Sequence, residues 1–323
     1  MTSADRPTTA DTTTADKRDA FPFADAAGKT VVVTGANAGL GYFASEQLAR
    51  AGAHVVLACR DQERAEAAVS AIRRRVRNAS VEATPLDVAD RASVDHAAQA
   101  LLARDRVDAL ILNAGIVHPP ARRATDAYGN ELVLATNVLG HFRLSAQTLP
   151  VLVRTPGSRV VVLGSLASRL ARFPLDDLQL ESSYNGWTAY ARSKIAAQAF
   201  GFELDRRLRA AGLDVAGVVV HPGYSTSGRT PGIRGINQPS HATRFADNLQ
   251  AAWSQGKDLG AHAIVRAVLD PEVRGGDYLG PRFLVKGEPA TARPTRTSRS
   301  PQVGARLWSL LEEYSDQRFD VSA

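Results

Sequence analysis

The sequence predicts an α/β protein in which helices cover both faces of a doubly wound parallel sheet of about seven strands. From residue 29 onward, short β-branched and apolar runs alternate with longer segments of helical periodicity. Several of these runs end directly in glycine, asparagine or serine. Parallel strands deliver such polar groups to one edge of a sheet. We therefore expect a single folded domain over residues 28–318.

The composition is that of a globular protein able to bury a large core. The chain has 323 residues, of which 44% are hydrophobic and 22% charged. No apolar run approaches the roughly 18 residues that a membrane span needs. The single cysteine, Cys59, excludes an intrachain disulfide, and the first residues lack the apolar core of a signal peptide. These features predict a cytoplasmic protein without a membrane span.

The net charge of +6 and the pI of about 9.7 raise the question of a nucleic-acid partner. The arginines are scattered through helical segments, and only 73–75 and 206–209 form clusters. Solvated helix faces account for this pattern better than a binding stripe does. We expect neither a nucleic-acid partner nor a metal site.

The two ends of the chain are predicted to lie outside the domain. Residues 1–27 are rich in Thr, Ala and Asp and show little apolar periodicity, which predicts a flexible arm. Residues 319–323 are expected to form a short tail.

The first strand, 29–34, runs into a turn containing Gly35, Gly39 and Gly41, and a helix follows through residue 50. Glycines there let the backbone approach a pyrophosphate, whose charge is met by the amide groups at the N-terminus of the helix. Asn37 and Leu40 belong to the same turn. The alternative is a tight turn without a ligand.

The second strand, 53–59, presents the residue that would meet the adenosine ribose of a dinucleotide. It ends in neutral Cys59 followed by Arg60, where an NAD site would carry a carboxylate. A guanidinium can bind a 2′-phosphate, so NADP(H) is favoured. Asp61 is a counter-signal that also fits as the N-cap of a helix over 62–77. Cys59 is interpreted as a small buried side chain rather than a reactive thiol.

Two further βα units follow. A strand near 80–86 ends at Asp87 and Val88, and Asp87 could bind an adenine amino group or serve as a cap. A helix over 91–104 leads to the strand 107–112 and to 113–115. A long helix over 129–153 contains Asn137, whose unfavourable mid-helix position indicates a buried polar role. His141 is expected to be structural.

The next strand, 158–165, brings Ser165 to the carboxyl edge of the sheet. After a small excursion, a helix over 188–211 carries Tyr190 and Lys194, and their spacing places both on one face. A nearby cation favours phenolate, so Lys194 is expected to lower the pKa of Tyr190. A solvated helix face is the alternative interpretation of this pair.

A strand at 214–220 ends before Pro222 and Gly223, and a Gly- and Ser-rich stretch, 224–257, then predicts a lid over the site. Within this stretch Phe245, Leu249 and Trp253 are spaced for one helix face. The alternative is that this face packs on the domain. A helix over 258–269, a seventh strand near 282–286 and a helix over 302–315 complete the prediction.

Taken in order, these motifs resemble the short-chain dehydrogenase/reductase family over 28–318, and within it an actinobacterial, retinol-dehydrogenase-like branch. The matching features are the glycine turn, Asp87, the 113–115 tripeptide, the catalytic set and Pro222-Gly223. Leu112 departs from the family's usual Asn, and Ser227 stands where many members carry Thr.

The resemblance implies a Rossmann-type fold and NADPH-dependent reduction of a ketone or aldehyde on a small to medium, largely apolar molecule. Ser165 would bind the carbonyl, Tyr190 would donate the proton, Lys194 would hold the nicotinamide ribose, and Asn137 would anchor a water. The positions expected to bind NADP(H) are Gly35, Asn37, Gly39, Leu40, Gly41, Arg60, Asp87, Val88, Asn113, Ala114, Gly115, Tyr190, Lys194, Pro222, Gly223, Ser225 and Ser227.

Other readings stay open at this stage. They are alcohol dehydrogenation, isomerisation through a transient ketone, a non-catalytic NADP(H)-binding redox sensor, and an S-adenosylmethionine-dependent transferase. The last would not need the Ser, Tyr and Lys set. The resemblance leaves a homodimer or a homotetramer open, and it does not name the substrate.

Overall fold

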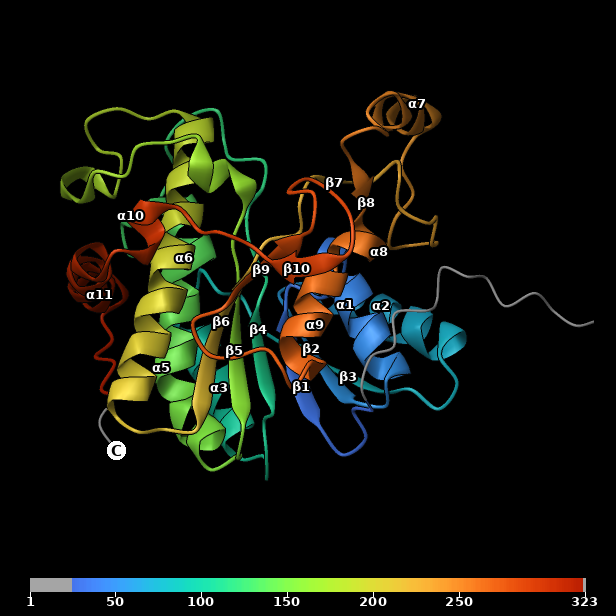
Figure 1. Cartoon of the computed structure of the whole chain (residues 1–323), viewed down its shortest axis with the longest axis horizontal. Helices are drawn as coiled ribbons and strands as arrows, with labels where there is room; N and C mark the ends of the chain where they lie inside the picture. The colour runs from blue at the N-terminus through green and yellow to red at the C-terminus, as the bar shows by residue number, and fades with distance from the viewer. Residues whose placement is uncertain (1–24, 322–323) are drawn as a thin grey trace, which may run out of the picture.

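The computed structural model of the chain describes residues 25–321 (Figure 1). Within this range a main sheet of eight strands is flanked by helices, and a two-stranded sheet, β7 with β8, stands apart. The strands are β1 (Thr30–Thr34), β2 (His54–Cys59), β3 (Ser80–Pro85), β4 (Ala109–Leu112), β5 (Ser158–Leu163), β6 (Val215–Val220), β7 (Ser225–Thr226), β8 (Gln255–Gly256), β9 (Tyr278–Pro281) and β10 (Pro289–Thr291).

The helices alternate with the strands, as predicted. They are α1 (Gly39–Arg50), α2 (Gln62–Arg75), α3 (Arg91–Leu102), α4 (Leu132–Leu134), the π-helix η2 (Ala135–Leu139), α5 (Gly140–Val153), the 3₁₀ turns η3 (Leu166–Arg169) and η4 (Leu175–Asp177), α6 (Gly186–Ala210), α7 (His241–Leu249), α8 (Lys257–Gly260), α9 (His262–Leu269), α10 (Arg296–Arg299) and α11 (Pro301–Ser315).

The sheet order is β10-β9-β6-β5-β4-β1-β2-β3. Seven strands run parallel, and β10 pairs antiparallel with β9 at the edge. This confirms the doubly wound sheet and adds one antiparallel strand to it. From β1 the chain winds outward to β2 and β3, whereas β4, β5 and β6 wind the other way. In such sheets ligands bind beyond the carboxyl ends of the strands where the winding direction changes.

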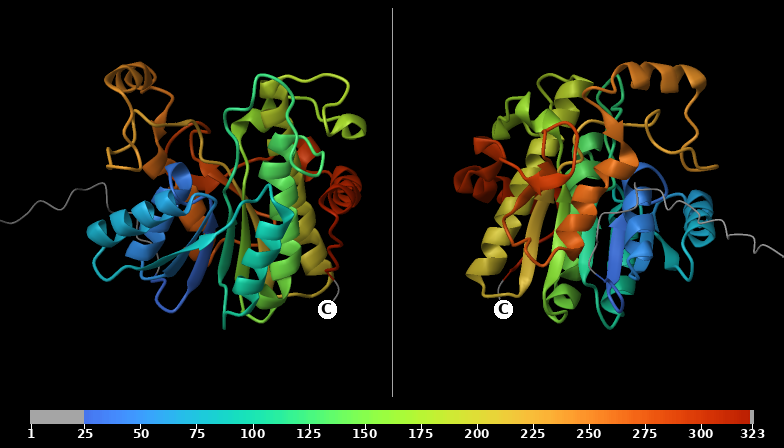
Figure 2. Two further views of the ribbon diagram at one scale, coloured as in Figure 1. Left: turned by 180° about the vertical axis from the view of Figure 1, so that it is seen from behind. Right: turned by 45° about the vertical axis from the view of Figure 1, so that its right-hand side comes forward.

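Alternation along each buried strand divides the core into two layers. Val31 and Val33 face a cluster that includes α1, α2 and α9, whereas Val32 faces a cluster that includes α3, α5 and α6. Both layers are visible on either side of the sheet in Figure 2. Because both faces are covered, the strands are continuous apolar runs rather than alternating ones.

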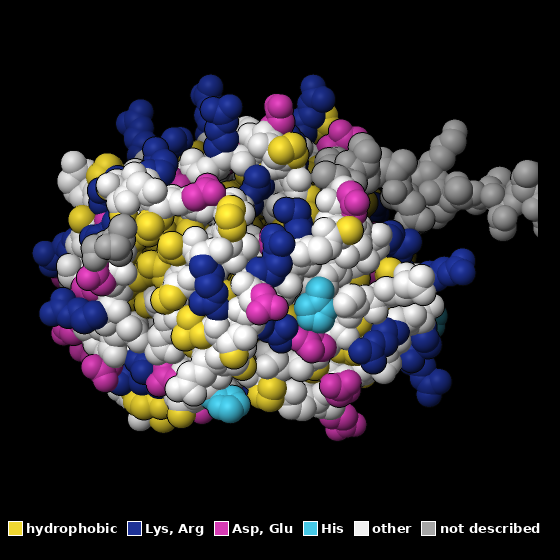
Figure 3. Space-filling model, turned by 90° about the horizontal axis from the view of Figure 1, so that it is seen from below, with side chains coloured by type: hydrophobic (Ala, Val, Ile, Leu, Met, Phe, Trp, Pro, Cys, Tyr) yellow, Lys and Arg dark blue, Asp and Glu magenta, His cyan; other side chains and the backbone are white. Residues whose placement is uncertain are grey.

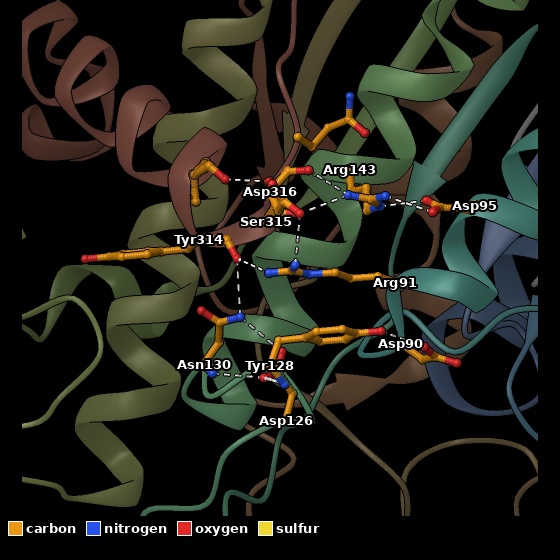
Figure 4. Close-up of polar contacts among 12 residues, drawn as sticks. Asp90, Arg91, Asp95, Asp126, Tyr128, Asn130, Arg143, Tyr314, Ser315 and Asp316 are labelled. Atoms are coloured by element: carbon orange, nitrogen blue, oxygen red, sulfur yellow. Dashed lines mark hydrogen bonds and ion pairs between the residues drawn. The ribbon is translucent and has the colours of Figure 1, made fainter.

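Two arginines fix the C-terminal end of α11 to the body (Figure 4). Arg91 Nη2 donates to Tyr314 O at 2.9 Å, and Arg143 Nη1 donates to the carbonyls of Ser315 and Asp316 at 3.1 and 2.9 Å. Arg143 also donates to Asp95 Oδ1 at 2.6 Å. Carbonyls at the end of a helix have no partner inside it, so these contacts satisfy them. The same arginines line a small hollow together with Tyr314 and Ser315.

Three of the described residues near the chain ends pack on the domain, although the sequence assigned them to the arm and the tail. Ala26, assigned to the arm, is fully buried, and its amide donates to Ala51 O at 2.8 Å. Phe319 and Val321, assigned to the tail, are 3% and 8% exposed. Both ends pack because the sheet and helices leave apolar surface there. The rest of the predicted arm, 1–24, lies outside the described residues.

The predicted strand near 282–286 is wrong. The strands are β9 and β10, and 282–286 form the turn between them, with Leu284 at φ 65°. The Phe-Leu-Val run has strand propensity, yet Phe283 is 70% exposed. Gly280 and Pro281, residue types that usually interrupt a strand, instead lie within β9, next to the edge strand β10.

Candidate functional site

Thr34 joins the carboxyl ends of β1 and β4 into one platform. Its hydroxyl donates to Ile111 O at 3.1 Å and accepts from the amides of Asn113 and Ala114, both at 2.9 Å. The Asn113 amide group donates to Thr34 O at 2.7 Å and to Gly35 O at 3.2 Å. The 113–115 motif thus holds the glycine turn in shape.

The glycine turn requires its small residues. A Cβ on Gly35, which has φ +65°, would lie 2.8 Å from Ala114 Cα, and one on Gly41 would lie 2.5 Å from Asn113 Nδ2. Ala38 precedes α1 and supplies no side-chain cap. The first amide groups of this 12-residue helix are therefore available to an anion, which fits a dinucleotide pyrophosphate.

Arg60 lies at the end of β2 with its guanidinium in solvent. Its side chain is 78% exposed, and Nη1 is 3.7 Å from Asp87 Oδ2. Asp61 caps α2, as predicted, by accepting from Arg64 N at 3.0 Å. Because the Asp61 carboxylate is used as the cap of α2, it does not pair with Arg60. The Arg60 guanidinium therefore stays exposed at the carboxyl end of β2.

Three neighbouring residues make contacts within the fold. Burial raises the pKa of Cys59 to about 11, so its thiol is inert near neutral pH. Asp87 Oδ1 accepts from Ala89 N at 3.0 Å and closes a turn. Val88 is 6% exposed, and its carbonyl lies where a side chain on Gly140 would clash.

Ser165 and Tyr190 are brought together across the edge of the sheet. Ser165 follows β5, and the Tyr190 hydroxyl donates to Ser165 Oγ at 3.3 Å. The helix that carries Tyr190 starts where the Asn185 side chain accepts from Thr188 N at 3.2 Å. This cap fixes the first turn of α6 and therefore the register of Tyr190.

Lys194 points inward one turn after Tyr190. It is 5% exposed, and Nζ donates to Leu163 O at 2.9 Å. Burial lowers its pKa to about 8. The expected lowering of the Tyr190 pKa is wrong for this structure: burial raises it, and the bond to Ser165 opposes that rise only in part. The ammonium binds the end of β5 rather than the phenol.

Asn137 lies in the π-helix η2 and is 2% exposed. Its Oδ1 accepts from Ile116 N at 2.7 Å, and its Nδ2 donates to Ser193 Oγ at 2.9 Å. This confirms the buried polar role predicted for it. The π turn aims the residue at the site, as such turns often do.

His141 is structural, as predicted. Nε2 is 3.0 Å from Thr34 Oγ1, and Nδ1 is 3.3 Å from Asn137 O. Burial lowers its pKa to about 3, so the ring is neutral. It ties the end of β1 to η2.

The turn after β6 is held by hydrogen bonds to residues much later in the chain. Gly223 has φ +68°, and Tyr224 N donates to Val285 O at 2.7 Å. Ser225 Oγ donates to Pro222 O at 2.9 Å. Ser227 Oγ accepts from Lys257 Nζ at 2.7 Å. The predicted cofactor positions after β6 thus lie on a turn shaped by residues far along the chain.

Sequence reasoning missed Gln198. It is fully buried, and its Nε2 donates to Ser165 O at 3.0 Å and to Ser168 Oγ at 3.0 Å. It therefore fixes the backbone that presents Ser165. Its position on the same face of α6 as Tyr190, two turns later, was the available signal.

The segment 224–257 contains one helix, α7, that stands off the body of the domain (Figures 1 and 2). Phe245 and Leu249 are each 68% exposed on it, and Trp253, which is 53% exposed, follows in a turn after the helix ends. These three side chains do not pack on the domain here. The expectation that all three share one helix face is correct only for the first two.

Neither a metal-ligand cluster nor a membrane-spanning helix is found among the described residues. Within residues 25–321, no three His, Cys, Asp or Glu side chains gather as metal ligands would. None of the described helices combines the length and apolar character that a membrane crossing requires.

Known proteins identify the class to which this fold and site belong. The family model for short chain dehydrogenases matches residues 29–234. The chain is 41% identical over 212 residues to retinol dehydrogenase 13 of Homo sapiens, an alignment covering 64% of this chain and 63% of that protein. The chain therefore spans less than two thirds of the length of that relative.

Solved structures agree with this assignment. An uncharacterised protein from Mycobacterium paratuberculosis matches with a TM-score of 0.75 and 34% identity, covering 93% of this chain and 97% of that one. The Pseudomonas aeruginosa RhlG/NADP active-site complex matches at 0.59 and 25% identity, covering 79% and 94%. The chain belongs to the short-chain dehydrogenase family, whose members are oxidoreductases that use a nicotinamide cofactor, and it is retinol-dehydrogenase-like.

Proposed function

We propose that the protein is an NADP(H)-dependent oxidoreductase that reduces a ketone or aldehyde on a small to medium, largely apolar molecule. The observation that carries this proposal is the Ser165–Tyr190 pair, 3.3 Å apart at the carboxyl edge of the sheet with Lys194 buried beside it. When bound, the cofactor supplies the hydride that the carbonyl carbon accepts.

Each residue of the set has a distinct task. The Ser165 hydroxyl donates to the substrate carbonyl oxygen, and Tyr190 donates the proton that this oxygen takes up. Tyr190 is protonated at neutral pH, because burial raises its pKa above the usual value, and it therefore has a proton to donate. Gln198 positions Ser165 through its backbone.

Lys194 and Asn137 support the proton transfer. The Lys194 ammonium, which donates to Leu163 O in this structure, would turn toward the phenolate left on Tyr190 and toward the nicotinamide ribose during the reaction. A water at Asn137 would be bound by the backbone carbonyl, since the side-chain amide is used by Ile116 and Ser193.

The preference for NADP(H) rests on Arg60. Its guanidinium is solvent-exposed at the end of β2 and can bind a 2′-phosphate. The residues that would hold the rest of the cofactor are those of the glycine turn, the Asn113 tripeptide and the Pro222 turn. The match to a relative solved with NADP supports the same choice.

The variant Tyr190→Phe should lose turnover but keep its affinity for NADPH. NADPH consumption across a panel of ketones and aldehydes should fall about 10²–10⁴-fold, because general acid catalysis is lost while ring packing is kept. NADPH affinity should stay within about twofold of wild type, a range far below that catalytic effect. Tyr314→Phe, on α11, is the matched control and should behave as wild type. Turnover by Tyr190→Phe close to wild type would refute the proposed acid.

Arg60→Ala should weaken NADPH about ten- to a hundredfold and leave NADH nearly unchanged, because a charge-assisted bond to phosphate is lost. Arg74→Ala, which removes one exposed cation at the far end of α2, controls for net charge. Calorimetric titration with both cofactors measures the difference. Equal losses for NADPH and NADH would place the 2′-phosphate contact elsewhere.

The alternatives predict different outcomes. Alcohol dehydrogenation would give faster turnover with NADP⁺ and an alcohol, and isomerisation would give product without net cofactor change. A redox sensor would bind NADPH in wild type and consume none with any carbonyl compound.

A further inference from the structure

Lys257 brings a cation to the glycine turn from a distant part of the chain. It is the first residue of α8, and its Nζ donates to Ser227 Oγ at 2.7 Å. A Cβ placed on Gly39 would lie 3.9 Å from Lys257 Cδ and 4.0 Å from Nζ. The ammonium therefore lies over the first residue of α1.

The local structure holds Lys257 firmly in this position. Its backbone amide donates to Thr230 Oγ1 at 2.8 Å, and Gln47 of α1 donates to the carbonyl of the next residue, Asp258, at 2.9 Å. These contacts fix α8 against α1. Gly260 has no Cβ, and Leu40 Cδ2 lies 3.0 Å from the point where one would stand.

The charge of Lys257 is poorly compensated by its surroundings. Its hydrogen-bond partner is a hydroxyl, although an ammonium has three donors. Partial burial lowers its pKa, and Asp247 opposes this only from beyond ion-pair distance. Asp247 Oδ2 itself accepts from Gly228 N at 2.6 Å. A half-buried cation without a bonded carboxylate is costly unless it meets an anion.

Two positive features thus face the same space above Gly39. One is the uncapped N-terminus of α1, and the other is the Lys257 ammonium. We propose that Lys257, with the Ser227 hydroxyl, binds the pyrophosphate of the dinucleotide and so ties the 224–257 segment to the bound cofactor. This inference rests on the proposed function. Arg60, at the end of β2, would serve the separate 2′-phosphate.

Two ligands distinguish the pyrophosphate from the 2′-phosphate. Adenosine 2′-monophosphate carries only the 2′-phosphate, and 2′-phospho-ADP-ribose carries both groups but no nicotinamide. Calorimetric titration of Lys257→Met should show a roughly tenfold or larger loss for 2′-phospho-ADP-ribose, the loss expected for one charged hydrogen bond. Affinity for adenosine 2′-monophosphate should be unchanged, which also reports that the variant is folded.

Lys286→Met is the matched control. Its Nζ donates to Ala251 O at 3.1 Å, so this variant loosens the same segment without touching the glycine turn. It should bind 2′-phospho-ADP-ribose as wild type does. An equal loss in Lys286→Met would assign the effect to packing, and an equal loss for both ligands in Lys257→Met would assign it to the 2′-phosphate. Either result overturns the proposal, as does unchanged binding of 2′-phospho-ADP-ribose.

A second measurement needs no variant. In the wild-type protein, amide hydrogen exchange over 225–230 and 257–260 should slow with 2′-phospho-ADP-ribose and not with adenosine 2′-monophosphate. Equal protection by both ligands would contradict the proposal. If wild type binds neither NADPH nor NADH, the proposed function fails before this inference is tested.

Discussion

At the scale of residues, the site combines a protonated acid, Tyr190, with a buried cation, Lys194, whose charge is disfavoured by burial. Tyr190 has a raised pKa and Lys194 a lowered one, both because of burial. Burial favours the neutral form of each group. A bound cofactor and substrate would remove further water, so the pair is prepared for proton transfer to substrate rather than to solvent.

Lys194 should make stability depend on pH in the absence of cofactor. Its pKa is about 8 in the folded protein and roughly 10.4 when unfolded, so between these values the unfolded chain binds more protons. Stability therefore rises with pH in this window. Relative to Lys194→Met, wild type should gain about 1 kcal/mol between pH 8 and 9. Urea unfolding at both pH values tests this, and parallel curves for the two proteins would contradict it.

The residues that could be predicted from sequence are those whose signal is local. Tyr190 and Lys194 share one helix face, and Ser165 follows its strand directly. Gln198 was missed because its role depends on a contact with Ser165, 33 residues earlier in the chain. Lys257 was missed because its role depends on its position beside Gly39, in a distant part of the chain. Likewise, Lys194 Nζ donates to Leu163 O rather than to the Tyr190 phenol, and residue spacing alone does not give this side-chain direction.

At the scale of elements, the strongly buried strands and helices were predictable and the edge of the sheet was not. β1, β2, β4, β5 and β6 are largely apolar and buried runs, whereas β3 at the opposite edge of the sheet is only partly buried. β9 and β10 are short and contain glycine or proline, and their pairing depends on β6 rather than on their own sequence. The π turn η2 is also invisible to periodicity, since it interrupts an otherwise helical pattern by one residue.

We propose that the segment 224–257, which contains α7, forms the substrate lid. Phe245, Leu249 and Trp253 are exposed on a part of the chain that begins at the turn after β6. Large apolar side chains that gather in the exposed part of one segment are typical of a ligand- or partner-binding surface. Lys257 would connect the base of this segment to the cofactor.

Trp253→Ala should therefore change the Michaelis constant and the preference among ketones more than it changes stability. Its side chain is 53% exposed, so the free energy of unfolding should move by no more than about 0.5 kcal/mol. Steady-state kinetics with short and long apolar ketones measures the first effect, and urea unfolding the second. Val153→Ala, an exposed apolar residue at the far end of α5, is the control. A large loss of stability with unchanged kinetics would make the segment structural.

At the scale of the whole molecule, the basic surplus is spread over the surface seen in Figure 3. Lys and Arg side chains alternate with Asp and Glu across this face, which is the view from below. Many arginines serve internal contacts: Arg143 holds the end of α11, and Arg207 lies 4.3 Å over the Trp308 ring. The charge of the chain thus has structural uses that a composition count does not reveal.

The C-terminal helix and the residues after it close one face of the molecule. Phe319 meets Phe142 at 5.3 Å and Trp308 at 4.8 Å between ring centroids, and Phe142 also contacts Phe200. This aromatic cluster joins α5, α6 and α11 to the last residues described. The chain end therefore contributes to the core, although the matched family region ends at residue 234.

Phe319→Ala should consequently destabilise the entire domain. Phe319 is 3% exposed, and removal of a buried phenyl ring typically costs about 3–5 kcal/mol. Phe283→Ala makes the same chemical change at a side chain that is 70% exposed, and it should cost no more than about 0.5 kcal/mol. Urea unfolding followed by far-UV circular dichroism compares the two variants directly. If both lose equally little, the C-terminal residues do not belong to the cooperative core, and the aromatic cluster is held by α5, α6 and α11 alone.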